Sequence, residues 1–325
     1  MKNFLDKISV PIKSNLEEFD YHFDKSLESE VQTINSIVKY LVRKKGKRLR
    51  PRLSLLSAKI CGNVNVKTYK VASLLEILHV ATLVHDDVVD ESDLRRGWPS
   101  VGRIWKNKLS ILVGDYLFSK ALTNMAEIDS MESVKILANL ASRLSQGEIL
   151  QIEKALRKDM TEDVYFKMIS DKTASLFSAS CKLGAITATE DSKKIEALTN
   201  FGEYLGLGFQ IKDDLFDLIG NIDKTGKPSG YDLKRNLLTL PLIYILNNKS
   251  SIKQKTFKLQ LKLLLRKNKF NEIKNLIVNE GGIEYAENKL LNISKKARKE
   301  LEIFTDSYVK DAMIEILEFN LVRNV

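Results

Sequence analysis

The chain has 325 residues, 44% of them hydrophobic and 29% charged, which is ordinary for a globular protein that can bury a sizeable core. Its 52 basic and 42 acidic residues give a net charge of +10. No long apolar N-terminal region, membrane-length apolar window or Cys-x-x-Cys pair is present, so we expect no signal peptide, no membrane span and a reducing, cytoplasmic setting.

Apolar residues spaced three and four apart predict an almost entirely helical chain. The predicted helices cover Val71–Val89, Leu109–Ala126, Val134–Leu156, Thr161–Leu183, Lys193–Leu218 and Tyr285–Phe304. Loops are expected at Gly62–Lys67, Ser92–Lys108 and Gly220–Asp232. Strand-like alternation is nearly absent and no Ser- or Pro-rich linker divides the chain. We therefore expect a single all-α domain over residues 1–325 with ten or more helices.

The first chemically informative segment is basic. Seven of the ten residues from Arg43 to Arg52 are Lys or Arg. A nucleic-acid patch and a solvated surface are both open interpretations of this run. No aromatic residues are interleaved for base stacking, however, and Pro51 indicates a nearby helix start, whose free backbone N–H groups suit a bound anion.

Two acidic clusters with the same Asp-Asp-x-x-Asp spacing follow apolar helical stretches. They are Asp86-Asp87-Val-Val-Asp90 and Asp213-Asp214-Leu-Phe-Asp217. Carboxylates four residues apart share a helix face and repel each other, so a compensating cation is expected. Mg²⁺ takes oxygen ligands and is commonly shared between one or two carboxylates and a substrate's phosphates. A single cluster could be a solvated helix end, whereas two matched clusters indicate a metal-bridged diphosphate site.

Basic residues follow each cluster closely. Arg95 and Arg96 come after the first, and Lys224 and Lys227 after the second. Arginine binds phosphate oxygens through two parallel N–H groups, and lysine supplies a point charge. Metal ions on one side of a diphosphate and these cations on the other would together neutralise it.

Further polar residues align with the acidic faces. His79 lies two turns before Asp86, and Gln210 lies one turn before Asp213. The stretch Ser170–Leu176 places Lys172 and Thr173 in a helix of otherwise small and apolar residues. A hydrogen-bonded core histidine and packing or capping serines are the structural alternatives for these positions.

Taken together, the motifs resemble the trans-polyprenyl diphosphate synthases, most closely the long-chain members such as octaprenyl diphosphate synthase. The matching segments are GKRLRP (46–51), ILHVATLVHDDVVDESDLRRG (77–97), LVGDYLFSKA (112–121), QGEILQ (146–151), DKTASLF (171–177), GFQIKDDLFDLIG (208–220) and DLKRNLLTLP (232–241). They occur in order over about residues 40–245. The resemblance implies an all-α isoprenoid-synthase bundle around a deep central cavity, and a homodimer.

The resemblance also implies individual roles. The diphosphate of isopentenyl diphosphate would be held by Lys47, Arg50, His79 and Arg96. An allylic diphosphate (farnesyl or similar) and its developing cation would face Arg95, Lys172, Thr173, Gln210 and Lys227. Two Mg²⁺ ions would bind Asp86 and Asp90, and Asp213 with Asp217 would bind a third. The residues Asp86, Asp90, Lys172, Thr173, Gln210 and Asp213 form the expected catalytic set. Asn236-Leu237 stands where the family usually has Gly-Lys, which removes one lysine contact to the allylic diphosphate unless Lys234 or Arg235 substitutes for it.

Product length is expected to depend on the residues one and two turns below the first cluster, which are Leu78, Ala81 and Thr82. Short-chain relatives commonly carry a bulky aromatic here, whereas position 81 is Ala. We therefore expect a long product, of about six to nine isoprene units (C30–C45) and most similar to octaprenyl, that supplies a quinone side chain.

Several alternatives stay open at this point. They are a shorter-chain (farnesyl or geranylgeranyl) synthase, a non-catalytic subunit of a heteromeric synthase suggested by Leu237, a terpene cyclase, and a protein that binds nucleic acid or anionic membrane through its positive charge. The paired clusters with GKRLRP and RRG favour condensation over cyclisation, and no nucleic-acid partner is expected. A transient, peripheral association with a membrane during product release is compatible with the synthase.

Overall fold

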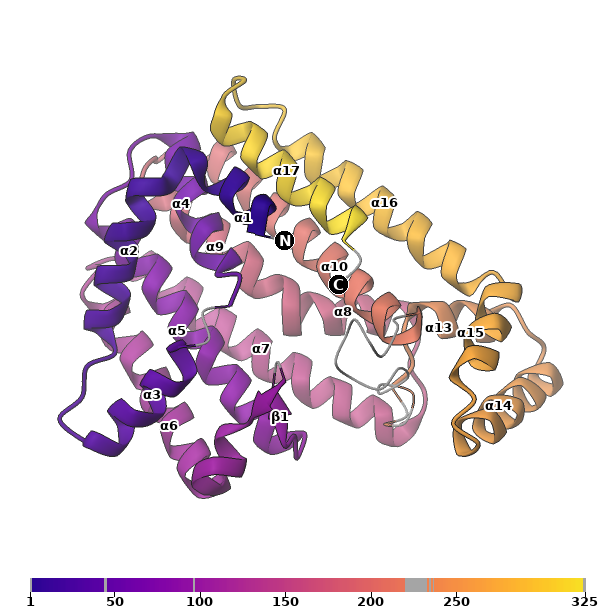
Figure 1. The fold of residues 1–325 in the computed structure, drawn as a ribbon. Helices are drawn as coiled ribbons and strands as arrows, with labels where there is room; N and C mark the ends of the chain where they lie inside the picture. The colour runs from indigo at the N-terminus through magenta and orange to yellow at the C-terminus, as the bar shows by residue number, and fades with distance from the viewer. Residues whose placement is uncertain are drawn as a thin grey trace. The chain divides into compact units, whose positions relative to one another are not determined.

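The structure, a computed structural model, describes residues 2–43, 46–95, 97–219, 233, 235 and 237–323. More than ten α-helices and one short hairpin account for most of these residues, which confirms the predicted all-α class (Figure 1). The chain divides into two compact units, the first of residues 1–140, 176–202 and 300–316 and the second of residues 141–175, 203–299 and 317–325. The single domain expected from the sequence stays a prediction.

The first unit begins with short helices and is built on a long central pair, α5 and α6. Its elements are α1 (Lys2–Ser9), η1 (Val10–Ile12), α2 (Lys13–Ser26), α3 (Gln32–Arg43), α4 (Leu49–Cys61), α5 (Val66–Val89), β1 (Leu94–Arg95), β2 (Trp98–Pro99) and α6 (Val101–Ala126). Helix α5 packs against α2, α4 and α6, and Figure 1 shows α5 beside α6. It is apolar on most of its circumference, which is typical of a buried central helix.

Helix α5 begins at a defined cap and ends at the first acidic cluster. The Asn65 side chain accepts a hydrogen bond from the Thr68 backbone N–H at 3.2 Å, and the Thr68 hydroxyl accepts one from the Asn65 N–H at 3.2 Å. This reciprocal cap fixes the first turn. At the other end the Asp90 N–H donates to the Asp86 carbonyl at 2.8 Å, so the cluster retains helical i, i+4 geometry.

The predicted loop over Ser92–Lys108 is wrong in its second half. Strands β1 and β2 form an antiparallel hairpin, and α6 already begins at Val101. The Ser100 hydroxyl accepts from the Arg103 N–H at 3.3 Å and caps this earlier start. Lys106, at φ 73°, interrupts the helix before the apolar repeat from Leu109 begins, which explains why periodicity indicated only the later part.

The second unit contains the π-helix and the C-terminal helices. Helices α7 (Met131–Arg157), α9 (Ser175–Ile186), α10 (Ser192–Ile219) and α17 (Tyr308–Val322) have residues in both units. The other elements of the second unit are α8 (Glu162–Ile169), η2 (Ser170–Ala174), α13 (Leu240–Asn247), α14 (Ser251–Arg266), α15 (Phe270–Asn279) and α16 (Gly282–Glu300), of which only Glu300 falls in the first unit. One apolar core forms around Tyr165, Ile211 and Leu290, and another around Leu242, Phe257 and Ile277.

Two helix predictions need correction. The helix expected over Thr161–Leu183 consists of α8, the π-helix η2 and α9, because the register changes at residues 170–174. The helix expected over Tyr285–Phe304 begins at Gly282 and ends at Glu300. The loop expected at Gly220–Asp232 lies outside the described residues. Within the described part of the chain, every helix is too short or too polar to cross a lipid bilayer.

Candidate active site

The first acidic cluster lies at the C-terminal end of α5, where a negative charge is unfavourable because the helix dipole is itself negative there. Asp86 and Asp90 are half-buried, and Asp87 is buried. Arg95, on the hairpin, places its Nε 2.5 Å from Asp87 Oδ1. One carboxylate of the cluster therefore positions an arginine of the following segment, whose two Nη groups are available in the fork geometry that suits a phosphate.

The basic segment before α4 meets α5 at His79. Arg50 Nη1 lies 3.0 Å from His79 Nε2, and because a guanidinium can only donate, His79 accepts at Nε2. The Arg50 guanidinium also stacks on the Phe177 ring at 4.8 Å. Lys47 is half-buried just before the helix and accepts a hydrogen bond from Arg52 through its carbonyl oxygen. The structure thus places two of the predicted diphosphate-binding side chains in contact.

A pocket of about 90 Å³ opens on the face of α5 that carries His79 and Asp87. Its walls are largely apolar and come from α3, α5 and the hairpin; Tyr40, Trp98 and Arg95 are among its residues. The residues expected to set product length lie on the same helix. Leu78 and Ala81 are buried, and Thr82 is half-buried and donates to the His79 carbonyl at 2.9 Å.

The π-helix η2 presents Lys172 and Thr173, which the sequence placed in an ordinary helix. π-Helices occur mostly as single turns within α-helices and are frequent at functional sites. Gly147 of α7 permits a close approach, since a Cβ there would lie 2.5 Å from the Lys172 backbone nitrogen. Lys172 forms an ion pair with Glu148 and donates to Gln151 Oε1 at 3.1 Å. The QGEILQ segment therefore both admits the π-helix and orients its lysine.

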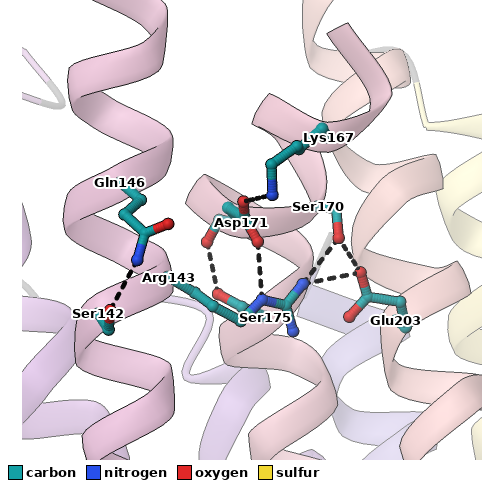
Figure 2. A network of polar contacts seen from close by, with 8 residues as sticks. All are labelled: Ser142, Arg143, Gln146, Lys167, Ser170, Asp171, Ser175 and Glu203. Atoms are coloured by element: carbon teal, nitrogen blue, oxygen red, sulfur yellow. Dashed lines mark hydrogen bonds and ion pairs between the residues drawn. The ribbon is translucent and has the colours of Figure 1, made fainter. Parts of the chain in front are cut away.

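Behind the π-helix, Arg143 of α7 binds three side chains from two other elements (Figure 2). Its Nε donates to Asp171 Oδ1 at 2.8 Å, and its Nη2 donates to Ser170 Oγ at 2.7 Å and Glu203 Oε1 at 3.2 Å. Burial lowers the pKa of Arg143, but the bonds to Asp171 and Glu203 outweigh this, so the net shift is upward. The guanidinium ties α7 and α10 to the first turn of η2.

The serines of this segment have structural roles, as the structural alternative anticipated. Ser170 bonds to both Arg143 and Glu203, and the Ser175 hydroxyl donates to the Asp171 carbonyl at 2.6 Å (Figure 2). The latter bond satisfies a backbone acceptor within the π-helix.

A chain of hydrogen bonds connects the π-helix to the second acidic cluster. The Thr173 hydroxyl donates to Gln210 Oε1 at 2.7 Å, and Gln210 Nε2 donates to Asp214 Oδ1 at 2.7 Å. Tyr165 is fully buried and donates its hydroxyl to Asp214 Oδ2 at 2.6 Å. Both oxygens of the buried Asp214 thus accept a bond, and the Gln210 amide is held with its oxygen toward Thr173.

Asp213 and Asp217 are the more accessible members of the second cluster, and both are half-buried on α10. Arg323, near the C-terminus, places Nη2 2.6 Å from Asp213 Oδ1 and donates to the Phe209 carbonyl at 2.9 Å. Its guanidinium stacks on the Phe209 ring at 4.0 Å. This arginine was not identified from the sequence.

The donor set suits divalent cations that are shared with a substrate. Each cluster offers two half-buried carboxylates four residues apart, Asp86 with Asp90 and Asp213 with Asp217, and these are hard oxygen ligands. Among the residues that the structure describes, no group of three or more His, Cys, Asp or Glu side chains is gathered to hold an ion alone. Mg²⁺ is usually bound by one or two carboxylates that leave positions for water and phosphate oxygens, so the residues fit such an ion.

Several predicted site residues lie outside the described residues, and others were missed. Arg96 and Lys227 belong to the first group, as does Asn236 of the departure from the family pattern. The missed residues are Tyr165, Arg143, Asp171 and Arg323. QGEILQ and DKTASLF pointed to the neighbourhood of the first three, but nothing near Arg323 distinguished it.

Comparison with known proteins identifies the family. A sequence profile of the polyprenyl synthetase family matches residues 31–279. The chain is 32% identical to an all-trans-nonaprenyl-diphosphate synthase (geranyl-diphosphate specific) of Rhodobacter capsulatus, over 99% of this chain and 98% of the relative. It is 29% identical to the octaprenyl diphosphate synthase of Escherichia coli, over 98% and 99% respectively.

The fold agrees with that assignment. The crystal structure of a polyprenyl synthase from Caulobacter crescentus, complexed with calcium and isoprenyl diphosphate, aligns with a TM-score of 0.89 and 31% identity over 99% of this chain and 98% of that one. The isoprenoid-synthase fold expected from the motifs is therefore confirmed. The chain belongs to the polyprenyl synthetase family and is a prenyltransferase related to the long-chain trans-polyprenyl diphosphate synthases.

Proposed function

We propose that this chain catalyses the Mg²⁺-dependent, sequential condensation of isopentenyl diphosphate onto an allylic diphosphate such as farnesyl diphosphate. The product proposed is an all-trans chain of about six to nine isoprene units, with octaprenyl as the specific length and a quinone side chain as its use. The relatives carry names of different lengths, nonaprenyl and octaprenyl, at similar identity. The observation that carries the proposal is the Thr173–Gln210–Asp214 chain, which links a polar π-helix to an acidic cluster.

The diphosphate of isopentenyl diphosphate would bind the basic residues near the start of α4. Arg50 and His79 are already in contact at 3.0 Å, so their side chains are held in place before a ligand binds. Lys47 and Arg96 complete the proposed set. An arginine that is held in place before binding neutralises an anion with little rearrangement, which favours tight binding.

The allylic diphosphate would be held by Arg95, Lys172 and Lys227 and by the carboxylates that carry the metal, Asp86, Asp90, Asp213 and Asp217. When bound, Mg²⁺ supplies Lewis-acid neutralisation of the departing diphosphate. Arg95 and Lys172 each have an anionic partner in this structure, Asp87 and Glu148, which positions them. Preorganised cations of this kind stabilise charge that develops on a leaving group.

The positive charge left on the allylic fragment would face polar dipoles. The Thr173 hydroxyl donates its proton to Gln210 Oε1, so the lone pairs of Thr173 Oγ1 remain available to a neighbouring carbocation. Asp214 fixes this orientation through Gln210 Nε2. Isopentenyl diphosphate then attacks through its double bond, and the released diphosphate is proposed to accept the proton that is lost.

The proposal is tested by incubating purified protein with farnesyl diphosphate, labelled isopentenyl diphosphate and Mg²⁺, with and without EDTA, and sizing the extracted products. We expect an EDTA-sensitive series that ends at one long chain. Products that end at four isoprene units, or extension of only shorter allylic primers and no further than three units, would identify a short-chain synthase. No incorporation from any primer would favour a subunit of a heteromeric enzyme, and Leu237→Lys would then be the first variant to make.

Replacing Asp86 by Ala provides the matching site test. Loss of one metal ligand should lower turnover by on the order of a hundredfold or more while the far-ultraviolet circular dichroism keeps its helical signal. Near-normal turnover in this variant would contradict the assignment of the first cluster to metal binding. Light scattering of the same samples would test the proposed homodimer.

A further inference from the structure

Helix α14 has an inner face that is packed and an outer face that is not. Phe257 and Leu261 are buried and join the apolar core that includes Ile273 and Ile277 of α15. Figure 1 shows α14 beside α15. These contacts stabilise α14 by packing one side of the helix, and they leave the other side unpacked.

The outer face carries three large aliphatic residues in one line. Ile252, Leu259 and Leu263 are 80%, 59% and 48% exposed. Positions seven and eleven apart fall on the same side of an α-helix, so the three residues form a continuous stripe opposite Phe257 and Leu261. Single exposed aliphatic residues are common, whereas an aligned set on one unpacked helix face marks an interaction surface.

The stripe is bordered by positive charge on both sides. Lys255, Lys262 and Arg266 are exposed along one border, and Lys253 and Lys267 along the other. Eight basic residues and no acidic residue fall between Lys249 and Asn271, which is most of the chain's excess of ten. Within the described part of the chain, none of the five bordering residues has an ion-pair partner, whereas the flanking Lys249 and Lys269 are paired with Glu280 and Glu272.

This combination distinguishes between occupants. An ordinary solvated helix mixes charges of both signs, and a nucleic-acid surface uses basic residues, with aromatic rings for single strands, but has no use for an exposed aliphatic stripe. A second copy of the same face would bring like charges together. An apolar stripe between basic borders is the arrangement of a helix that lies in the interface of an anionic bilayer, with aliphatic side chains in the acyl region and Lys and Arg at the headgroups.

We propose that the outer face of α14 (Ile252, Leu259 and Leu263 with Lys253, Lys255, Lys262, Arg266 and Lys267) docks the protein on an anionic lipid bilayer. The binding itself is independent of the catalytic assignment. Its purpose rests on the proposed function, because a long polyprenyl chain is insoluble in water and is best released directly into lipid.

The test measures co-sedimentation of the full chain with vesicles, without substrates. One set contains 30% phosphatidylglycerol in phosphatidylcholine, and the other contains phosphatidylcholine alone. We expect binding to the anionic vesicles that weakens as salt is raised, and at least tenfold weaker binding to the neutral ones.

Two variants separate the two components of the surface. Lys255→Gln/Lys262→Gln/Arg266→Gln should weaken binding to anionic vesicles by roughly a hundredfold, since each basic residue near such a surface contributes about fivefold. Leu259→Ser/Leu263→Ser should weaken binding at least tenfold because it removes the inserted groups. The matched control, Lys295→Gln/Lys296→Gln/Lys299→Gln on α16, loses the same charge elsewhere and should bind within threefold of the wild type.

The outcomes are decisive because all changed residues are exposed and the fold is checked by circular dichroism. Equal weakening by the control would show that binding follows net charge and would overturn the assignment to α14. Binding to duplex DNA that α14 substitutions abolish, without binding to vesicles, would identify a nucleic-acid surface instead. Vesicle binding without prenyl transfer would support the proposed lipid-binding surface and refute the catalytic proposal. Prenyl transfer without vesicle binding would refute the surface and support the catalytic proposal.

Discussion

Asp213 has a cationic partner inside the protein before any ligand binds. Arg323 lies 2.6 Å from its carboxylate and is itself nearly inaccessible to water. Burial lowers the pKa of Arg323, and the charge of Asp213 opposes that shift. An arginine that stays protonated at this position competes with a divalent cation for the same carboxylate, so it should set how much Mg²⁺ the second cluster needs.

Replacing Arg323 by Gln should therefore have two effects. The free energy of unfolding should fall by on the order of 2 kcal/mol, because the stacking on Phe209 and the bond to its carbonyl are lost. The Mg²⁺ concentration for half-maximal turnover should also fall, because Asp213 loses its competing cation. Urea unfolding and a Mg²⁺ titration of activity measure the two quantities.

Arg298→Gln serves as the control for this experiment. Arg298 pairs with Glu318 at 3.3 Å, but both side chains are more than half exposed. Loss of an exposed pair should change stability by less than about 0.5 kcal/mol and leave the Mg²⁺ requirement unchanged. Equal behaviour of the two variants would show that the contacts of Arg323 contribute no more than an exposed ion pair and do not affect Mg²⁺ binding.

Candidate site residues could be identified from the sequence where the residue type itself indicates a chemical role. Asp86 stood out because two clusters of carboxylates occurred at helical spacing after apolar stretches, whereas the roles expected for Thr173 and Gln210 came from the family resemblance. Arg323 did not stand out, because its partner Asp213 lies 110 positions earlier and nothing local separates it from the other basic residues of the chain. Long-range pairing, rather than residue type, decides which arginine is buried.

At the level of elements, the π-helix η2 depends on an arginine that belongs to a different helix. Arg143 donates hydrogen bonds to Asp171 and Ser170 in the first turn of η2 and to Glu203 on α10. Lys172 and Thr173 follow directly in the chain. A shift of η2 would displace both residues from the positions in which Glu148, Gln151 and Gln210 hold them.

Arg143→Met should consequently reduce turnover more than it reduces stability. We expect a ten- to hundredfold lower kcat, since a displacement of about 1 Å costs that much. The KM for isopentenyl diphosphate should change less, because this substrate is proposed to bind other residues. Steady-state kinetics with each substrate varied in turn measure kcat and the KM of each substrate separately. Arg143→Lys should recover part of the rate because it keeps one bond to Asp171.

Lys167→Ala removes an ion pair to the same Asp171, at 3.1 Å, and should leave kcat nearly unchanged because the lysine is exposed and Asp171 keeps its bond to Arg143. Parallel losses of kcat and stability in Arg143→Met, without recovery in Arg143→Lys, would mean that Arg143 only supports the fold.

Helix α5 provides the prediction for product length. Ala81 is buried one turn below Asp86, and Ala81→Phe should shorten the product because a ring would fill the path proposed for the growing chain. Overpacking at a buried position costs about 1–3 kcal/mol, so folding is verified first by thermal unfolding. Val66→Phe adds bulk at an exposed position in the first turn of α5, outside the pocket, and should leave the product unchanged. The same final length in Ala81→Phe and the wild type would place the limit elsewhere.

Helices were predictable from the sequence wherever apolar residues recur at three- and four-residue spacing. The cores of α5, α7, α10 and α16 follow three- and four-residue spacing and were found. The first turns of α6 were not, because their signal is the Ser100 cap rather than apolar repetition. The π-helix was also missed, since its cause is the close approach of Gly147 to the Lys172 backbone, a contact between residues 25 positions apart that no local pattern encodes.

For the whole molecule, the order of seven motifs carried the family assignment, and no single one would have been enough. Profile, relatives and fold comparison agree with it. The two acidic clusters lie in different compact units of the chain, on α5 and on α10. Whether they serve one reaction is thus a question about the molecule and not about either helix.

A double-mutant cycle addresses that question. If both clusters act on the same diphosphate, Asp86→Ala and Asp213→Ala should each lower kcat/KM by on the order of a hundredfold or more, and the double variant should lose less than about a further tenfold. Residues that act as a unit are strongly non-additive, because the first substitution already removes most of the shared stabilisation. Single-turnover assays of the four proteins, with circular dichroism as the folding check, supply the energies. Losses that simply multiply would show that the two clusters contribute independently, and the common metal-bridged diphosphate would have to be abandoned.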